Sequence, residues 1–228
     1  MVVPCFNEES RLPSSLVAAQ AYLEGTRGGY ELILVDDGSR DCTVQLIREA
    51  ERAHAAVRGL VLPVNRGKGR ALAEGVAVSR GRLVLISDAD FSAPIDELPK
   101  LEAAIDAGAD IAIGSRAKHG AREVDQPLHR RAMGKVFNLL VQALLLPGIW
   151  DTQCGFKLLR GDVARELFAR LRVDGFAFDV EMLYLARRSG RVVREIPVRW
   201  RNSPTTRVQA VRHSREMVMD LLRIRLGR

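Results

Sequence analysis

Two aspartates separated by one residue, Asp88 and Asp90 on either side of Ala89, have types and spacing suited to chemistry on a charged ligand. Two carboxylates this close together in a turn can share a hard cation. Proteins normally hold Mg²⁺ or Mn²⁺ with one or two carboxylates together with the phosphates of a substrate. Aspartate is also common in turns after strands, so the spacing taken alone favours a plain turn. Whether Asp88 and Asp90 bind a metal therefore depends on what surrounds them.

A second acidic turn, Asp36-Asp37-Gly38-Ser39, follows an apolar run over residues 30–35. Adjacent like charges are costly unless a ligand uses one of them. A carboxylate at a strand end can accept hydrogen bonds from a base N–H or a ribose hydroxyl. The alternative is a turn that caps the next helix. We expect Asp36 and Asp37 to bind a nucleoside.

The segment 65–69, Asn-Arg-Gly-Lys-Gly, is basic and rich in glycine. It lacks the GxxxxGK[ST] spacing of a P-loop, which excludes a Walker site. Its glycines let the backbone approach a ligand closely, and Lys68 at a helix start can meet a phosphate. A solvated basic turn is the alternative. Further along, Arg116 and the basic group Arg130, Arg131 and Lys135 are candidates for a second anion site, although surface arginines are usually only solvated.

Apolar runs and helical patterns alternate over the first two thirds of the chain. The expected strands are residues 1–3, 30–35, 59–64, 82–87, 110–114 and 192–197. Four helices are expected over 41–54, 97–107, 130–146 and 178–188. Three more are expected, one that begins at residue 12, one that ends at residue 79 and one that begins at residue 207. This alternation predicts one α/β domain with a mainly parallel central sheet flanked by helices. Ligands bind beyond the carboxyl ends of such strands, where five polar clusters fall, so we expect Asp88 and Asp90 to form a metal site.

Composition limits the partners of this chain. Its 228 residues are 47% hydrophobic and 28% charged, as in ordinary globular proteins. The net charge of +7 calls for an anionic partner: nucleic acid, an anionic membrane surface or a phosphorylated substrate. Acidic strand ends would repel a polyanion, and 5% aromatic residues are few for a single-strand binder. We therefore expect no nucleic acid, and keep a basic nucleotide- or nucleic-acid-binding module without turnover as the non-enzyme alternative.

Location is suggested by three sequence features. The cysteines are odd in number and widely spaced, which fits free thiols in a reducing cytoplasm. No secretory signal is visible, and the apolar stretch 139–150 is shorter than the about 20 residues of a membrane-spanning helix. The basic, amphipathic helix expected at 207–228 packs on the core or rests on anionic lipid. We expect a cytoplasmic protein in peripheral contact with an anionic membrane surface.

Taken in order, the motifs resemble those of family 2 inverting glycosyltransferases with the GT-A fold. The matching segments are 2–9, 35–39, 65–69 and 88–90. Three more segments, 114–116, 151–157 and 176–181, are similar to the dolichyl-phosphate β-glucosyltransferase branch, a relative of the polyprenyl-phosphate mannosyltransferases. The resemblance covers nearly the whole chain, and 151–157 is its most specific part. It departs from the family in a short first strand and in the absence of the transmembrane helices that close relatives often carry.

The resemblance implies a division of labour along the chain. Residues 1–115 would bind the nucleotide-diphospho-sugar donor, 116–206 the acceptor, and 207–228 would form the amphipathic helix. Asp88 and Asp90 would hold Mg²⁺ or Mn²⁺ and the diphosphate, beside Ala89 and Lys68. The residues implied around the nucleoside are Pro4, Phe6, Glu8, Asp36 and Asp37. Those implied at the acceptor phosphate are Arg116, Arg130 or Arg131, and Lys135, while Arg160 and Arg207 would close over the donor.

The implied reaction moves a hexose, with inversion, to a polyprenyl phosphate. Glucose from UDP-glucose is the first expectation, and GDP-mannose or a sugar-hydroxyl acceptor is the alternative. Asp90 and Arg116 would be catalytic, Arg116 by positioning the attacking phosphate. A phosphate monoester has a second pKa near 6, so it is already ionised at pH 7 and needs little help from a base. A hydroxyl acceptor needs one. Asp179 or Glu181 could serve, or both could be structural.

Overall fold

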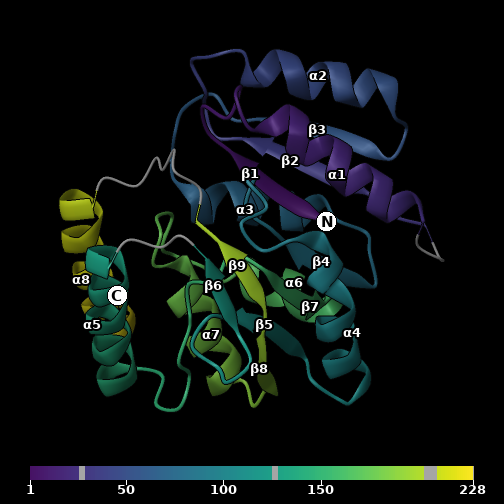
Figure 1. Ribbon diagram of the computed structural model, residues 1–228. Helices are drawn as coiled ribbons and strands as arrows, with labels where there is room; N and C mark the ends of the chain where they lie inside the picture. Colours follow the sequence, from purple (N-terminus) through teal and green to yellow (C-terminus); the bar gives the residue numbers. More distant parts are fainter. Residues whose placement is uncertain (26–28, 125–127, 203–209, 228) are drawn as a thin grey trace.

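A seven-stranded sheet runs through the centre of the computed structural model, which describes residues 1–25, 29–124, 128–202 and 210–227 (Figure 1). Only the backbone is described for 128–131 and 210–215. The strand order is β3-β2-β1-β4-β7-β5-β8. The strands are β1 Val2–Cys5, β2 Leu32–Asp36, β3 Val57–Val61, β4 Leu83–Ile86, β5 Ile111–Ser115, β7 Lys157–Arg160 and β8 Val193–Pro197. Neighbouring strands in this sheet are parallel, except that β7 is antiparallel to both β4 and β5. The predicted α/β class with a mainly parallel sheet is therefore confirmed.

The antiparallel strand β7 and the helix α6 after it, Gly161–Phe168, were not predicted from the sequence. The apolar core of β7 is only Leu158 and Leu159, too short a run to show a strand period. The strand predicted at 59–64 was also placed too late, since β3 spans Val57–Val61. Its partner β2 ends at Asp36 and the chain turns at Gly38, so β3 has no partner strand beyond Leu62, whose N–H donates to Asp36 O.

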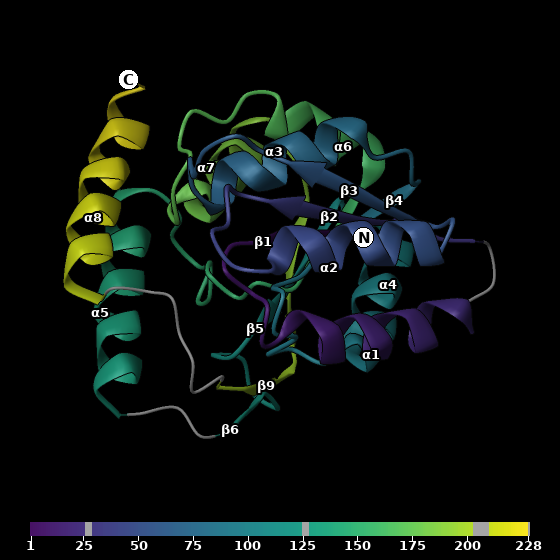
Figure 2. The same cartoon turned by 90° about the horizontal axis from the view of Figure 1, so that it is seen from above.

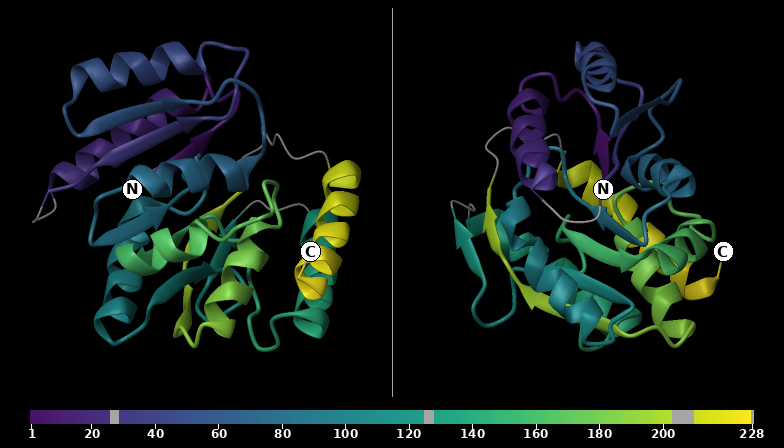
Figure 3. Two further views of the ribbon diagram at one scale, coloured as in Figure 1. Left: turned by 180° about the vertical axis from the view of Figure 1, so that it is seen from behind. Right: turned by 90° about the vertical axis from the view of Figure 1, so that its right-hand side faces the viewer.

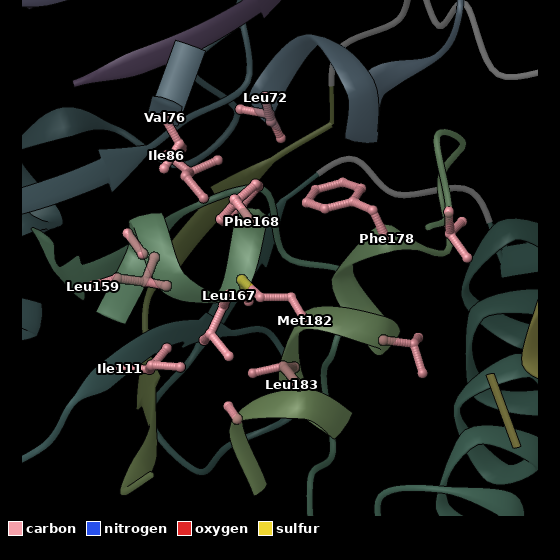
Figure 4. Close-up of a cluster of buried hydrophobic side chains, with 14 of the residues drawn as sticks. Leu72, Val76, Ile86, Ile111, Leu159, Leu167, Phe168, Phe178, Met182 and Leu183 are labelled. Atoms are coloured by element: carbon pink, nitrogen blue, oxygen red, sulfur yellow. The ribbon is translucent and has the colours of Figure 1, made fainter. Parts of the chain in front are cut away.

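Helices cover both faces of the sheet, because strand residues alternate between them. In β2, Ile33 packs toward α3 (Lys68–Val78), α6 and α7 (Phe178–Arg188), whereas Leu34 packs toward α1 (Leu12–Glu24) and α2 (Thr43–Ala53). The short 3₁₀ turn η1 (Ile95–Glu97) and α4 (Leu98–Asp106) lie on the α1 face. Figure 2 shows α3, α6 and α7 on one side of the strands and α1 and α4 on the other. Figure 4 shows the larger core, where leucine, valine and phenylalanine side chains from α3, α6 and α7 meet the sheet.

Four elements stand outside this three-layer body. Helices α5 (Leu128–Leu144) and α8 (Ala210–Leu226) pack side by side, on the side to which the carboxyl ends of β1 and β2 point (Figures 1, 2 and 3). The predicted C-terminal helix is therefore present from Ala210, and residues 207–209 lie outside the described residues. The short strands β6 (Arg122–Val124) and β9 (Arg199–Arg201), which were not predicted, form a separate parallel pair.

Candidate active site

The acidic turn after β4 holds two carboxylates that each meet a cation from another element. Asp88 Oδ1 accepts a hydrogen bond from Lys68 Nζ at 2.5 Å. Asp90 Oδ2 accepts one from Arg11 Nη1 at 3.2 Å, and its Oδ1 accepts the backbone and hydroxyl donors of Ser92. Phe91, the residue after Asp90, has φ 46°, an uncommon backbone conformation for a bulky residue and one that clusters at functional sites. Hydrogen bonds therefore fix the positions of both carboxylates in this turn.

Asp88 is ionised at neutral pH in this setting. Burial alone would raise its pKa, but the Lys68 charge and hydrogen bond, with more distant Lys157 and Arg116, outweigh burial and lower the pKa. Its side chain still keeps 34% of its surface exposed, so a ligand can reach it. An ionised and accessible carboxylate is what a hard cation requires.

Gly155 brings the segment 151–157 against the acidic turn. A Cβ on Gly155 would lie 2.0 Å from Asp88 Oδ2, so only glycine fits there without moving the carboxylate. Lys157 holds this segment in place through two contacts of its fully buried side chain. Its Nζ donates to Cys154 O at 2.5 Å and lies 2.6 Å from Asp179 Oδ1. Burial raises the pKa of Asp179, and the Lys157 charge partly opposes that shift. The most specific motif of the sequence therefore packs against the metal-site candidate.

The turns after β2 and β3 form one unit beside β1. Asp37 Oδ1 and Oδ2 accept the backbone N–H groups of Arg66 and Gly67 at 2.9 and 2.8 Å. Burial raises the pKa of Asp37, and these two N–H bonds oppose the shift. Gly38 has φ +71°, and a Cβ there would lie 2.6 Å from Asn65 N. The carboxylate of Asp37 thus fixes the basic loop 65–69 in place.

Asp36 keeps one hydrogen-bond acceptor that the described residues leave unused. It is fully buried, and its Oδ2 accepts the Ser39 N–H at 3.0 Å. Its Oδ1 is buried and has no hydrogen-bond partner among the residues that the structure describes. A buried carboxylate oxygen without a donor costs free energy that a ligand N–H or O–H can recover. This atom lies at the carboxyl end of β2, where the nucleoside was predicted.

The end of β1 contributes the predicted residues Pro4, Phe6 and Glu8. Pro4 and Phe6 are partly buried, so part of each remains accessible to a ligand. The carboxylate of Glu8 is bonded by Arg11 through Nε at 2.6 Å and through Nη2. Arg11 also reaches Asp90, so the β1 end and the acidic turn are tied together through one guanidinium. No local pattern in the sequence marks Arg11, because its partners are distant in the chain or separated from it by a turn.

Arg116 occurs at the end of β5 with a partner that the sequence analysis missed. Its Nε and Nη2 donate to the two oxygens of Asp151 at 2.8 and 2.9 Å, and its guanidinium lies 5.2 Å from the Trp200 ring centre. Burial on its own would raise the pKa of Asp151, but the Arg116 charge and hydrogen bonds outweigh it and lower the pKa. This bidentate geometry is strong and directional. Arg116 therefore holds segment 151–157, whatever else it binds.

One predicted site residue is in the wrong place. Arg160 pairs with Leu83, the first residue of β4, whereas the acidic turn follows Ile86 at the other end of that strand. Its side chain is 55% exposed and lies 3.7 Å from Asp162. The expectation that Arg160 closes over the donor is therefore wrong, because β7 is antiparallel to β4 and carries Arg160 away from the site.

The rest of the predicted basic group is only partly described. Lys135 is exposed on α5. Arg130 and Arg131 belong to α5, but their side chains lie outside the described residues, and so does the whole of Arg207. Their roles stay predictions.

An open groove of about 580 Å³ lies beside Asp90. One wall is the acidic turn with the residues just after it, and the other is the β6–β9 pair. The lining residues are Asp90, Phe91, Ser92, Pro94, Arg122, Val124, Arg199, Trp200, Arg201 and Asn202. None of the residues around Asp36 and Asp37 lines it. The site therefore has two sides, one at the ends of β1 and β2 and one in this groove, with the acidic turn between them.

The donor set suits a hard divalent cation shared with a ligand. Asp88 and Asp90 supply two carboxylates, and no third His, Cys, Asp or Glu completes a metal-binding group within the described part of the chain. Mg²⁺ and Mn²⁺ accept this number of protein carboxylates when substrate phosphates provide further oxygens. Lys68 and Arg11, which now bond to these carboxylates, show that the turn already attracts positive charge.

Comparison with known proteins decides the family. The model of glycosyl transferase family 2 matches residues 1–168, which is well over half of the chain. The chain belongs to glycosyltransferase family 2. This transferase is 41% identical to dolichyl-phosphate beta-glucosyltransferase of Drosophila melanogaster, over 88% of the chain and 66% of that relative. It is 37% identical to the Homo sapiens protein of the same description, over 99% of the chain and 74% of that relative. The transferase thus spans about two thirds to three quarters of the length of these relatives.

Solved structures agree on the fold of this family 2 transferase. Glucosyl-3-phosphoglycerate synthase from Mycobacterium tuberculosis, solved with Mn²⁺, UDP-glucose and phosphoglyceric acid, superimposes with a TM-score of 0.74 at 21% identity. The match covers 99% of the transferase and 78% of that chain. At this identity the likeness shows the fold, and it confirms the predicted GT-A domain.

Proposed function

We propose that this transferase moves glucose from UDP-glucose to a polyprenyl phosphate, with inversion at the anomeric carbon and with the help of Mg²⁺ or Mn²⁺. The observation that carries the proposal is the acidic turn Asp88–Asp90, packed against Gly155 of the segment that resembles the dolichyl-phosphate β-glucosyltransferases. The names of the curated relatives, dolichyl-phosphate beta-glucosyltransferase, support both the sugar and the acceptor.

In this proposal the donor extends from the ends of β1 and β2 to the acidic turn. The nucleoside lies at the ends of β1 and β2, next to Asp36, whose buried Oδ1 has no donor among the described residues. Pro4 and Phe6 line the same end of β1. The diphosphate then reaches Asp88 and Asp90, near the loop that Asp37 fixes and the Lys68 side chain at the start of α3. Lys68 lies within reach of the phosphate charge because it already bonds Asp88.

Asp88 and Asp90 would hold the divalent cation, which would neutralise charge on the departing diphosphate. The protein holds the reacting groups in line: Asp88 and Asp90 fix the leaving side, and cations of the acceptor part fix the attacking side. The bond from the anomeric carbon to the diphosphate breaks as a bond to the acceptor oxygen forms. The diphosphate keeps the electron pair, and an ionised acceptor phosphate has no proton to lose.

The two candidate general bases are engaged elsewhere, which favours a phosphate acceptor over a hydroxyl. Glu181 Oε2 accepts the backbone N–H groups of Arg172 and Val173 at 2.9 and 2.8 Å, so it holds a loop. Asp179 is buried against Lys157. A hydroxyl acceptor needs a base within hydrogen-bond reach. An ionised phosphate needs only cations.

Exposed apolar side chains on α5 and α8 support a peripheral position on a membrane. They are Met133, Val136, Leu139, Leu140, Val218, Met219, Leu222 and Leu226. Leu221 and Ile224 on α8 are buried, so α8 both packs on the protein and presents an apolar row outward. Within the described ranges, no helix is long and apolar enough to span a bilayer. A basic, amphipathic surface of this kind suits anionic lipid. The free, buried thiols of Cys5 and Cys154 suit a reducing compartment, which supports the cytoplasmic side of the membrane.

A transfer assay tests the proposal. The transferase is incubated with Mn²⁺, a dolichyl phosphate in detergent, and UDP-glucose or GDP-mannose in turn. We expect glucosyl phospholipid from UDP-glucose and a β-linkage in the product. Transfer from GDP-mannose alone would contradict the donor, and transfer to a sugar hydroxyl alone would contradict the acceptor.

A further inference from the structure

Segment 172–175, between α6 and α7, lies against the start of α3, where the loop 65–69 becomes helical. Gly67 is the residue before α3 and has no side chain that could cap the helix. The backbone N–H of Arg70, in the first turn, instead donates to the carbonyl of Asp174 at 3.1 Å. A carbonyl from a distant part of the chain therefore caps α3.

Two glycines on either side of Lys68 allow the same segment to approach α3 closely. A Cβ on Gly67, which has φ +114°, would lie 2.5 Å from Asp174 O. A Cβ on Gly69 would lie 2.6 Å from Val173 O. Neither glycine could carry a side chain without a movement of backbone atoms. The backbone on both sides of Lys68 is therefore packed directly on this segment.

The side chain of Lys68 extends from these contacts to the acidic turn. Its Nζ bonds Asp88 Oδ1 at 2.5 Å and lies 5.8 Å from the ring centre of Phe178, the first residue of α7. Only 18% of the side chain is exposed. The position of this ammonium group therefore depends on where segment 172–175 and α7 hold the start of α3.

Glu181 on α7 holds segment 172–175 in turn. Its Oε2 accepts the backbone N–H groups of Arg172 and Val173 at 2.9 and 2.8 Å, and its side chain is buried. Val173 is buried as well, so its N–H would lose its partner if the carboxylate were removed, which is unfavourable. The carboxylate of Glu181 therefore fixes the first two residues of the segment that contacts α3.

We propose that Glu181 is a positioning residue for the donor: it fixes segment 172–175, which fixes the start of α3 and so directs Lys68 to the diphosphate. The inference rests on the proposed function, in which the diphosphate lies near Lys68 and Asp88. Glu181 acts through Lys68 and contacts neither substrate. Loss of Glu181 therefore weakens binding of the diphosphate and leaves binding of the nucleoside, at the ends of β1 and β2, unchanged.

The test measures binding of UDP with Mn²⁺ by calorimetry and binding of uridine by NMR titration. A charge-assisted hydrogen bond of ordinary strength predicts that Lys68→Met lowers the affinity for UDP about tenfold. Glu181→Ala should lower it by a similar factor, whereas uridine, which has no phosphate, should bind as it does to the wild type. Glu181→Gln keeps an oxygen that can accept both N–H groups, so it should retain most of the wild-type affinity for UDP.

Glu166→Ala on α6 is the matched control. It also removes a glutamate from a helix on this face of the sheet, but the partners of Glu166 are the partly exposed Arg170 and Arg191. We expect wild-type affinity for UDP. The double variant Lys68→Met with Glu181→Ala should bind UDP no more weakly than Lys68→Met alone, because changes that act through one contact are not additive.

Circular dichroism checks that each variant is folded. If Glu181→Ala does not fold, Gly69→Ala replaces it, because the added Cβ pushes Val173 and the start of α3 apart and should also weaken binding of UDP but not of uridine. Wild-type affinity for UDP in the folded variant, equal losses for UDP and uridine, or additive losses with Lys68→Met would overturn the inference alone. Wild-type affinity for UDP in Lys68→Met would contradict the proposed donor placement itself, and the inference with it.

Discussion

The change Gly155→Ala separates the geometry of the metal site from the stability of the fold. The added Cβ would lie 2.0 Å from Asp88 Oδ2, 2.3 Å from Cγ and 2.6 Å from Oδ1. The carboxylate must therefore retreat by about 1 Å to reach even a tight contact of 3.0 Å. A displacement of about 1 Å at a reacting group can cost about 100-fold in rate. We expect kcat/KM for UDP-glucose to fall by about that factor, and the affinity for Mn²⁺ with UDP to fall as well.

The fold should survive this change. The clash is with the end of a side chain that is 34% exposed, and the Gly155 backbone does not lie in the left-handed region. The cost of overpacking is then near the low end of its usual range, about 1 kcal/mol, or about 2–4 °C in Tm for a domain of this size.

Steady-state kinetics and a Mn²⁺ titration by calorimetry check the prediction, with circular dichroism for Tm. Gly134→Ala on α5 is the matched control, because a Cβ there meets nothing within 4 Å. We expect the control to keep full activity. A Gly155→Ala protein with wild-type kcat/KM and wild-type Mn²⁺ affinity would refute the claim that Gly155 sets the position of Asp88.

Three further changes test other parts of the site. Asp37→Ala removes the acceptor of two backbone N–H groups in loop 65–69, so KM for UDP-glucose should rise about tenfold while KM for the polyprenyl phosphate is unchanged, as measured by kinetics. The pKa of Asp151 is lower in the folded protein than in the unfolded chain, where it is about 3.9. Its ion pair with Arg116 therefore stabilises the protein above the unfolded pKa, and this stabilisation is lost as pH falls through the folded pKa. The Tm difference between the wild type and Asp151→Asn should be constant from neutral pH to about 5 and shrink below about 4. Leu139→Ser with Leu222→Ser, both exposed, should weaken co-sedimentation with anionic vesicles and leave Tm unchanged; unchanged sedimentation would argue against the α5–α8 surface.

The parallel part of the fold and one edge of the site were predictable from local patterns. Strand runs such as 30–35 are long and apolar, and the polar turns that follow them mark the carboxyl edge of the sheet. Asp36, Asp37, Lys68, Asp88 and Asp90 were found in this way, and the structure brings their turns together.

The rest of the site depends on contacts that have no local signature. β7 contains too few apolar residues to reveal its direction, and the error in placing Arg160 followed from that. The Arg116–Asp151 pair joins residues 35 positions apart, and the Arg11–Asp90 pair joins residues 79 apart. Spacing along the chain cannot pair such charges. The short β6–β9 pair, with Arg122 and Arg201, has a strand period too brief to recognise.

The central claim is that Asp88 and Asp90 hold the diphosphate of UDP-glucose through a divalent cation. Titration of UDP-glucose into the transferase, with and without Mn²⁺, tests it most directly when repeated with Asp88→Asn and Asp90→Asn. The account predicts tight binding by the wild type only when Mn²⁺ is present, and loss of this metal dependence in both variants, with the Tm of each variant near that of the wild type. Binding of UDP-glucose that is equally tight without Mn²⁺, or unaffected by either substitution, would contradict it.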